Sequence, residues 1–309
     1  MSPSEPSFLD CDHAGTQPGM HRMAYWSWGK PHHPHVVLCV HALARQGRDF
    51  DVLAQRLIGT DGERCRVVCV DVAGRGMSEW LPDPALYQVP QYAADLVTLL
   101  MALKGQGAQT VDWVGTSMGG LIGIAVAGQT ALTPALTSLK PRKLILNDIG
   151  PVVQWSALQR ICGYLGADKR FATEKEIVDY LWGLSTSFGP HSPEQWLALS
   201  KPMIRQATEE QGAPFKLHYD PSIAIPVRAT TPETAAQGEA MLWQLYDAIS
   251  SDTLLIRGMD SDLISAETAK QMQARGPKAK LVQFAGVGHA PTLVQPDQTK
   301  AVEDFIFGA

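Results

Sequence analysis

The stretch VDWVGTSMGGLIG, Val111 to Gly123, decides the fold of this chain. Its first four residues are mostly β-branched or aromatic, which is typical of a buried strand. The pentapeptide GTSMG follows at once with Ser117 at its centre, and the small residues from Gly120 to Gly128 predict a helix. A strand, a sharp turn and a helix with this G-x-S-x-G spacing predict that the hydroxyl of Ser117 is held out of the sheet as a nucleophile. Glycine is required on both sides of the turn because a Cβ there would crowd the neighbouring backbone.

Buried strands and amphipathic helices alternate on either side of this stretch. Continuous apolar runs predict strands at 35–41, 66–72, 143–149, 252–258 and 280–286. Apolar residues at helical spacing predict helices that include 91–103, 265–274 and 298–307. This alternation predicts an α/β fold with a mostly parallel sheet and helices on both faces. The fragment 23–29 reads as a further strand, and residues 1 to about 20 as a tail or an irregular start.

Helix signals dominate between the strands 143–149 and 252–258. Thr173 and Ser192 each begin a capping box. We therefore expect a helical cap over 151–235, inserted into a core that consists of 1–150 and 236–309. A helix over 239–249 is expected to return to the core, and 214–231 to form an extended connection.

Composition limits the possible partners of the chain. The 309 residues are 45% hydrophobic and 18% charged, with a net charge of −5, and lysine and arginine form no patch. We therefore expect neither nucleic acid nor a membrane surface as a partner. The polar N-terminus predicts no signal peptide, and the apolar runs are too short to span a bilayer. Five cysteines, with no second pair beside Cys65 and Cys69, predict no zinc site and a reducing cytoplasm. No dinucleotide fingerprint or cofactor lysine is visible, so no cofactor is expected.

A serine nucleophile needs a base and a carboxylate that orients the base. His289 lies in a glycine-flanked loop after the strand 280–286. Asp260 and Asp262 follow the strand 252–258, and Asp148 ends the strand before the cap. The carboxyl ends of parallel strands meet at one edge of the sheet, where ligands bind. The residues leave all three carboxylates open as the acid, and spacing favours Asp262 narrowly.

Acyl transfer also needs donors for an oxyanion. One should be the N–H of Met118, the residue after the nucleophile, and the other the N–H of Leu43 in the loop after the strand 35–41. His41 is expected to shape this loop by hydrogen bonding or to contact substrate. We interpret Gly74-Arg75-Gly76 as a turn near the site that packs and takes no part in catalysis.

From about residue 23 to its end, the chain resembles the capped α/β-hydrolases, in particular bacterial carboxylesterase-like serine hydrolases. The resemblance rests on four segments: GTSMGG at 115–120, DVAGRGMS at 71–78, LLIRGMDSD at 254–262 and GVGHAPTL at 286–293. It implies the α/β-hydrolase fold with Ser117 as nucleophile, Asp262 as acid, His289 as base, and oxyanion donors at Leu43 and Met118. The chain departs from the family at Ala42, where members usually have glycine, and a methyl group there could tilt the loop.

The function expected first is hydrolysis of a small-molecule ester with apolar groups, through an acyl-serine intermediate. Meta-cleavage carbon–carbon hydrolases, amidases, lactonases and thioesterases use the same residues, and a slow-turnover ligand receptor could keep the same fold. Dehalogenases and epoxide hydrolases are disfavoured because they carry Asp at the position of Ser117. Candidate substrate-binding residues are His41 and the cap tryptophans Trp155, Trp182 and Trp196, although packing within the cap is the competing interpretation for each tryptophan.

Overall fold

The computed structural model describes residues 5–13, 19–207 and 213–308, and this part of the chain is built around an eight-stranded sheet. The strand order is β1-β2-β4-β3-β5-β6-β10-β11. From β4 to β11 neighbouring strands are parallel, whereas β2 pairs antiparallel with both β1 and β4. The strands are β1 (Ser7–Asp12), β2 (Met20–Trp28), β3 (His35–Val40), β4 (Arg66–Asp71), β5 (Thr110–Thr116), β6 (Lys143–Asn147), β10 (Asp252–Gly258) and β11 (Lys280–Phe284). The prediction of a mostly parallel α/β sheet is confirmed.

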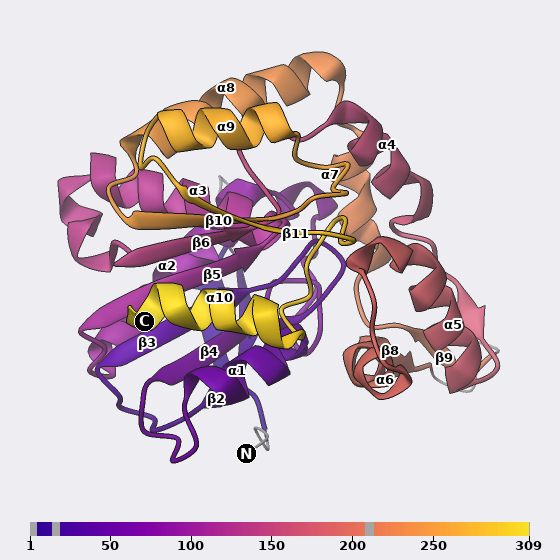
Figure 1. Ribbon diagram of the computed structural model, residues 1–309. Coiled ribbons are helices and arrows are strands. Elements are labelled where there is room, and N and C mark those ends of the chain that lie inside the picture. Colours follow the sequence, from indigo (N-terminus) through magenta and orange to yellow (C-terminus); the bar gives the residue numbers. More distant parts are fainter. Residues whose placement is uncertain (1–4, 14–18, 208–212, 309) are drawn as a thin grey trace.

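Helices cover both faces of the sheet, as Figure 1 shows. One face packs against α1 (Asp51–Leu57) and α10 (Pro296–Phe307), which bury Leu53, Leu57 and Ile306. The other face packs against α2 (Val89–Gly105), α3 (Met118–Leu132), α8 (Pro232–Ala248) and α9 (Ala266–Ala274). Two apolar cores result, and each fully buried aliphatic or aromatic side chain contributes about 1.5–3 kcal/mol to folding. These cores hold the central strands rigid, so the loops at the strand ends have a fixed base.

The N-terminal region differs from the expected irregular start. Residues 7–12 form β1, which pairs antiparallel with β2 from Ser7↔Tyr25 to Asp12↔Met20. Residues 1–4 and 14–18 lie outside the described residues. The sequence SFLDCD buries only Cys11, and its other side chains are exposed or half-buried. An edge strand of this kind lacks the apolar alternation by which strands are recognised in a sequence.

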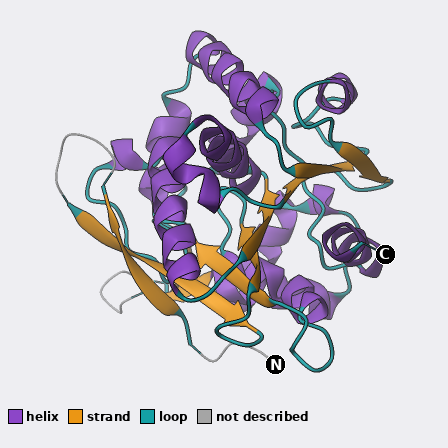
Figure 2. Cartoon of the chain, turned by 90° about the vertical axis from the view of Figure 1, so that its left-hand side faces the viewer, coloured by secondary structure: helices purple, strands orange, loops and turns teal. Residues whose placement is uncertain are grey.

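The segment between β6 and α8 lies at one end of the sheet, where the parallel strands end (Figure 1), and Figure 2 views the molecule from the side opposite to this segment. Its helices are α4 (Trp155–Tyr164), α5 (Glu174–Leu184), α6 (Pro193–Ser200) and α7 (Ala224–Arg228), and its strands are β7 (Arg170–Phe171), β8 (Ile204–Gln206) and β9 (Phe215–Leu217). Thr173 and Ser192 cap α5 and α6, as predicted; Ser192 completes its capping box, whereas Glu176 accepts from the N–H of Ala172 instead of that of Thr173.

The small sheet of this segment, in the order β7-β9-β8, was not expected. The prediction of an extended connection over 214–231 is wrong for α7, whereas β9 is extended but belongs to this small sheet. Helix α8 begins at Pro232, so the expected boundary between 235 and 236 falls inside its first turns. Among the residues that the structure describes, none of the helices combines the length and apolar character needed to cross a bilayer.

Candidate active site

Ser117 sits in the sharp turn between β5 and α3. Its backbone has φ 52° and ψ −118°, a conformation that few residues other than glycine adopt. Ser117 directly precedes the first residue of α3. A Cβ on Gly115 would lie 2.3 Å from the carbonyl oxygen of Gly119, and a Cβ on Gly119 would lie 2.0 Å from that of Val40. The strained turn is therefore possible only with glycine at both positions, as the sequence predicted.

His289 joins Ser117 to a carboxylate in a continuous chain of hydrogen bonds. Its Nε2 lies 3.0 Å from Oγ of Ser117, and its Nδ1 lies 2.8 Å from Oδ2 of Asp148. Ser117 is 8% exposed and Asp148 is fully buried. An imidazole held in this way can take a proton from the hydroxyl while the carboxylate fixes its orientation.

Asp148 directly follows β6 and has φ 55°. The end of the neighbouring strand β10 supplies its partners: the N–H of Gly258 donates to Oδ1 at 2.9 Å, and the hydroxyl of Ser261 donates to Oδ2 at 2.6 Å. The backbone N–H of Asp148 donates to the carbonyl of Ile256 at 2.7 Å. These bonds hold the buried carboxylate in one orientation, with one oxygen facing His289.

The prediction that Asp262 orients His289 is corrected by this geometry. The carboxylate of Asp262 is about half exposed and accepts two bonds from the guanidinium of Arg160 in α4, at 2.7 and 2.9 Å. Asp260 is exposed, and in the described structure the ring nitrogens of His289 bond to Asp148 and Ser117 instead. The carboxylate beside His289 is Asp148, the third of the three alternatives that the sequence left open.

The two expected oxyanion donors come from separate segments of the chain: Met118 follows Ser117 directly, and Leu43 lines the cavity beside Ser117. Met118 is the first residue of α3, where the N–H has no partner within the helix. Leu43 belongs to the turn after β3 and lines the cavity beside Ser117. Both N–H groups are therefore candidates for binding an oxyanion, and Ala42 does not remove Leu43 from the site.

His41 holds the turn after β3, which carries Leu43, through hydrogen bonds. It is fully buried, with Nε2 accepting the N–H of Val72 at 2.9 Å and Nδ1 donating to the carbonyl of Ala42 at 2.7 Å. Burial lowers the pKa of His41 to about 3, so the imidazole is neutral. Both ring nitrogens bind the protein, so His41 shapes the loop, as one of its two expected roles required, and is not free to bind substrate.

Arg75 connects the two candidate donors and was assigned only a packing role from the sequence. Its side chain is fully buried. Nε donates to the carbonyl of Leu43 at 2.8 Å, Nη1 to the carbonyl of Ala73 at 2.6 Å and to Tyr92 Oη at 2.9 Å, and Nη2 lies 3.6 Å from Sδ of Met118. Within the described residues its acceptors are all neutral, so a buried positive charge lies behind the turn that carries Leu43 and beside the side chain of Met118.

A mainly apolar cavity opens above Ser117 and His289. The inserted segment contributes the following wall residues: Ile161, Tyr164, Leu165, Leu181, Leu184, Phe188, Leu199 and Met203. The three tryptophans predicted to bind substrate are absent from these walls in the described structure. Trp196 is buried and packs edge to face against Trp182 at 5.0 Å between ring centroids, and Trp155 begins α4. The expectation that tryptophans line the pocket is therefore wrong, and smaller apolar side chains do so.

Comparison with known proteins agrees with this architecture. The model of the alpha/beta hydrolase family matches residues 37–302. A 3-hydroxybutyrate-oligomer hydrolase of Cupriavidus necator is 48% identical over 291 residues, which cover 94% of each chain. An esterase of Mycobacterium tuberculosis is 27% identical over 78% of this chain and 73% of that protein.

Solved structures show the same arrangement of elements. The crystal structure of an alpha/beta hydrolase from Novosphingobium aromaticivorans is 32% identical, with a TM-score of 0.78 over 98% of this chain and 97% of that one. The family model covers most of the chain, and the relative from Cupriavidus necator is similar over nearly its whole length. On this evidence the chain belongs to the alpha/beta hydrolase family.

Proposed function

We propose that this protein hydrolyses carboxylic esters with Ser117 as nucleophile, His289 as general base and Asp148 as the carboxylate that orients His289. The observation that carries the proposal is the unbroken hydrogen-bond chain from Asp148 through His289 to Ser117, at the floor of an apolar cavity. Chains of this geometry activate a serine hydroxyl for attack on a carbonyl carbon.

The reaction follows from the positions of these groups. Oγ of Ser117 attacks the ester carbonyl while its proton moves to Nε2 of His289, and the N–H groups of Met118 and Leu43 donate to the resulting oxyanion. When the carbon–oxygen bond breaks, the alcohol leaves with the proton from His289. Water then attacks the acyl-serine, gives its proton to His289, and releases the acid with the regenerated Ser117 hydroxyl.

The segment 151–231 acts as a cap over this cavity. It supplies most of the apolar wall. It also contacts the base loop directly: Oγ of Ser187 donates to the carbonyl of His289 at 2.9 Å, and the N–H of Gly288 donates to the carbonyl of Ser187 at 2.6 Å. The cap therefore selects the substrate and restrains the loop that carries the base.

The substrate class is a short ester of hydroxy acids that has an apolar chain and a free carboxylate. The relative at 48% identity is a hydrolase of 3-hydroxybutyrate oligomers, which have this chemistry. Two arginines border the cavity. Arg45 is 11% exposed and its guanidinium is occupied by both oxygens of Asp49 and by the carbonyl of Leu199.

Arg160 is the better partner for a substrate carboxylate. Its side chain is 43% exposed, against 11% for Arg45, so an anion that enters the cavity reaches its guanidinium more readily. Guanidinium groups bind carboxylates through charge-assisted N–H donors. Asp262 thus orients Arg160 at the cavity.

The test compares the dimer of 3-hydroxybutyrate with its methyl ester, which has no free carboxylate. Wild type is expected to hydrolyse both, with a lower KM for the acid, and an organophosphonate should label Ser117 alone. Arg160→Gln should remove the preference for the acid and leave turnover of the methyl ester unchanged. Absence of ester turnover by wild type would overturn the proposed reaction, whereas equal KM values for the two esters in wild type would overturn only the substrate class.

A further inference from the structure

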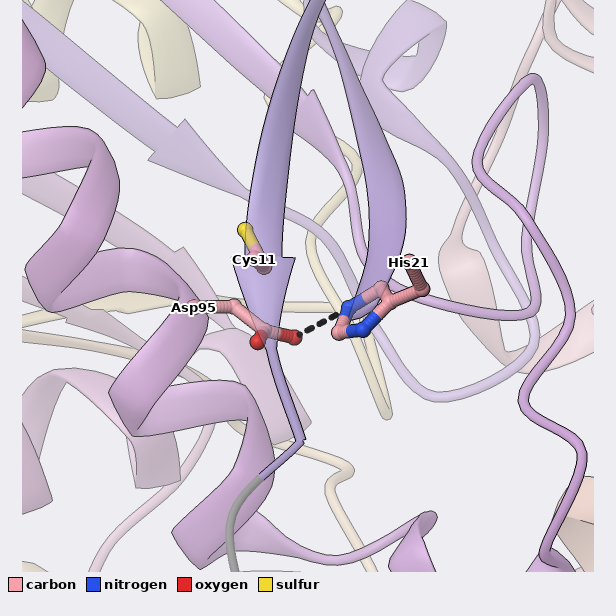
Figure 3. A group of neighbouring side chains, drawn as sticks. All are labelled: Cys11, His21 and Asp95. Carbon is pink, nitrogen blue, oxygen red and sulfur yellow. Dashed lines mark hydrogen bonds and ion pairs between the residues drawn. The ribbon is translucent and has the colours of Figure 1, made fainter. Parts of the chain in front are cut away.

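A group of three buried side chains lies between the sheet and α2, among the antiparallel strands and away from Ser117. Figure 3 shows Cys11, His21 and Asp95 close together on β1, β2 and α2, with His21 and Asp95 facing each other. Cys11 and His21 are direct partners in the antiparallel pairing of β1 with β2, so their side chains share one face of the hairpin. Helix α2 packs on that face and brings Asp95 to both.

These side chains offer a sulfur, a nitrogen and an oxygen at one point. One ligand atom from each lies within 4.8 Å of the other two, and Nε2 of His21 lies 3.1 Å from Oδ2 of Asp95. Ligands around a tetrahedral zinc ion, with bonds of about 2.0–2.3 Å, are separated by roughly 3.2–3.8 Å. The three atoms therefore need to move by about an ångström at most to share one ion.

Burial makes this group unusual for a surface hairpin. Cys11 is 1% exposed, His21 2% and Asp95 0%. Nδ1 of His21 is buried without a hydrogen-bond partner in the described structure. A buried carboxylate costs free energy unless a positive charge compensates it. A divalent cation with one thiolate and one carboxylate gives a ligand set with no net charge, which suits this environment.

The carboxylate is already oriented for such a role. Oδ1 of Asp95 accepts a hydrogen bond from Nε2 of Gln91 at 2.7 Å, and the same amide donates to the carbonyl of Asp12 at 2.9 Å. Outer partners of this kind fix the direction of a ligand and strengthen metal binding. Here the outer partner also connects α2 to the end of β1.

We propose that Cys11, His21 and Asp95 bind a divalent transition-metal ion, with zinc the best match to this set of sulfur, nitrogen and oxygen donors. On binding, the thiol of Cys11 loses its proton to solvent and forms the metal–sulfur bond, His21 binds through Nε2 with its proton on Nδ1, and water takes the fourth position. The ion has a structural role: it fastens the β1–β2 hairpin to α2. The sequence does not reveal the site because His21 and Asp95 are 74 residues apart and form no metal-ligand motif.

Cobalt(II) is the direct probe, because a thiolate bound to it produces a sulfur-to-cobalt absorption band. Protein treated with a chelator is expected to bind one Co²⁺ per chain with this band and to release one proton. Zn²⁺ should displace the cobalt and raise the melting temperature. Ester turnover should be the same before and after metal removal, since Ser117, His289 and Asp148 belong to different elements.

Two cysteine variants separate this site from chance binding. Cys11→Ser is expected to lose the absorption band and the zinc-dependent rise in melting temperature while it keeps ester turnover. Cys162→Ser is the matched control, since Cys162 is an unpaired, half-buried thiol of α4, and it should behave as wild type. Asp95→Asn should weaken Co²⁺ binding at least tenfold. The proposal is overturned if wild type shows no sulfur-to-cobalt band at stoichiometric Co²⁺, or if Cys11→Ser keeps it.

Discussion

Oδ2 of Asp148 lies 2.8 Å from Nδ1 of His289, although the two residues are 141 positions apart in the chain. The carboxylate comes from the end of β6, and the adjacent strand β10 contributes Gly258 and Ser261 as hydrogen-bond donors to it. Two neighbouring strands thus divide the task between them: one presents the acid and the other holds it in place.

Replacement of Asp148 by asparagine should almost abolish turnover. The amide cannot stabilise the imidazolium that forms on His289 and favours the wrong tautomer, which in serine hydrolases lowers kcat by about 10⁴-fold. Asp262→Asn is the matched control, because its carboxylate binds Arg160 and does not reach His289. Steady-state kinetics on a neutral chromogenic ester should show kcat of Asp262→Asn within about threefold of wild type. A larger loss in Asp262→Asn than in Asp148→Asn would reverse the assignment.

The sharp turn that holds Ser117 could be predicted from the sequence because local rules determine it. Glycine at 115 and 119 has a steric cause within the turn itself, and the apolar runs that became β3, β4 and β10 are buried on both faces. The carboxylate was harder to predict for a geometric reason. The strands β6 and β10 are neighbours, so Asp148 and Asp262 both follow strands that end at the same edge of the sheet.

Three further features depend on contacts that local sequence does not specify. Arg160, in α4, binds the carboxylate of Asp262, and this ion pair joins residues that are 102 positions apart. The tryptophans of the cap pack against each other because the cap must fill its own small core, which leaves Leu and Ile to line the cavity. Edge strand β1 escaped prediction because it buries only Cys11 and is held by its backbone pairing with β2.

Gly119 tests the steric argument at the turn. Its Cβ in a Gly119→Ala variant would lie 2.0 Å from the carbonyl oxygen of Val40, which is rigid backbone of β3. We expect loss of turnover. The free energy of unfolding should fall by about 1–3 kcal/mol or more, as it does at other overpacked sites. Gly163→Ala is the control. Gly163 lies in α4, and no atom lies within 4 Å of the added Cβ. The higher helix propensity of alanine should therefore stabilise this variant by about 0.5–1 kcal/mol. Chemical denaturation of both variants measures the contrast, and equal stabilities would refute it.

Arg75 should affect the transition state more than substrate binding. In Arg75→Gln the positive charge is lost and the carbonyl of Leu43 loses its donor. We expect kcat to fall by about 10- to 100-fold, a part of the roughly 2.7–4 kcal/mol that a whole oxyanion donor provides, with KM nearly constant. Arg75→Lys keeps the charge without the planar fork and should lose less.

Folding defects must be separated from this effect, because the buried carbonyls left without a donor cost about 1–3 kcal/mol each. Titration of active sites with an organophosphonate gives the folded, competent fraction of each variant. If kcat per competent site equals that of wild type in Arg75→Gln, the arginine is a packing residue only, as the sequence first suggested.

His41 should make stability depend on pH. Burial lowers its pKa to about 3 in the folded state, while an unfolded histidine titrates near about 6.5. Between these values the unfolded chain binds the extra proton and the folded chain does not, so this contribution to stability is complete above about pH 6.5 and is lost as the pH falls. At pH 5 the loss from this group is about 2 kcal/mol relative to pH 7.5.

Urea unfolding of wild type and His41→Gln at both pH values isolates this contribution. Glutamine can still accept from the N–H of Val72 but does not titrate. The free energy of unfolding of His41→Gln should therefore fall by about 2 kcal/mol less than that of wild type between pH 7.5 and pH 5. An identical fall in both proteins would mean that His41 is protonated in the folded state at pH 5, and the loop that carries Leu43 would then require a different support.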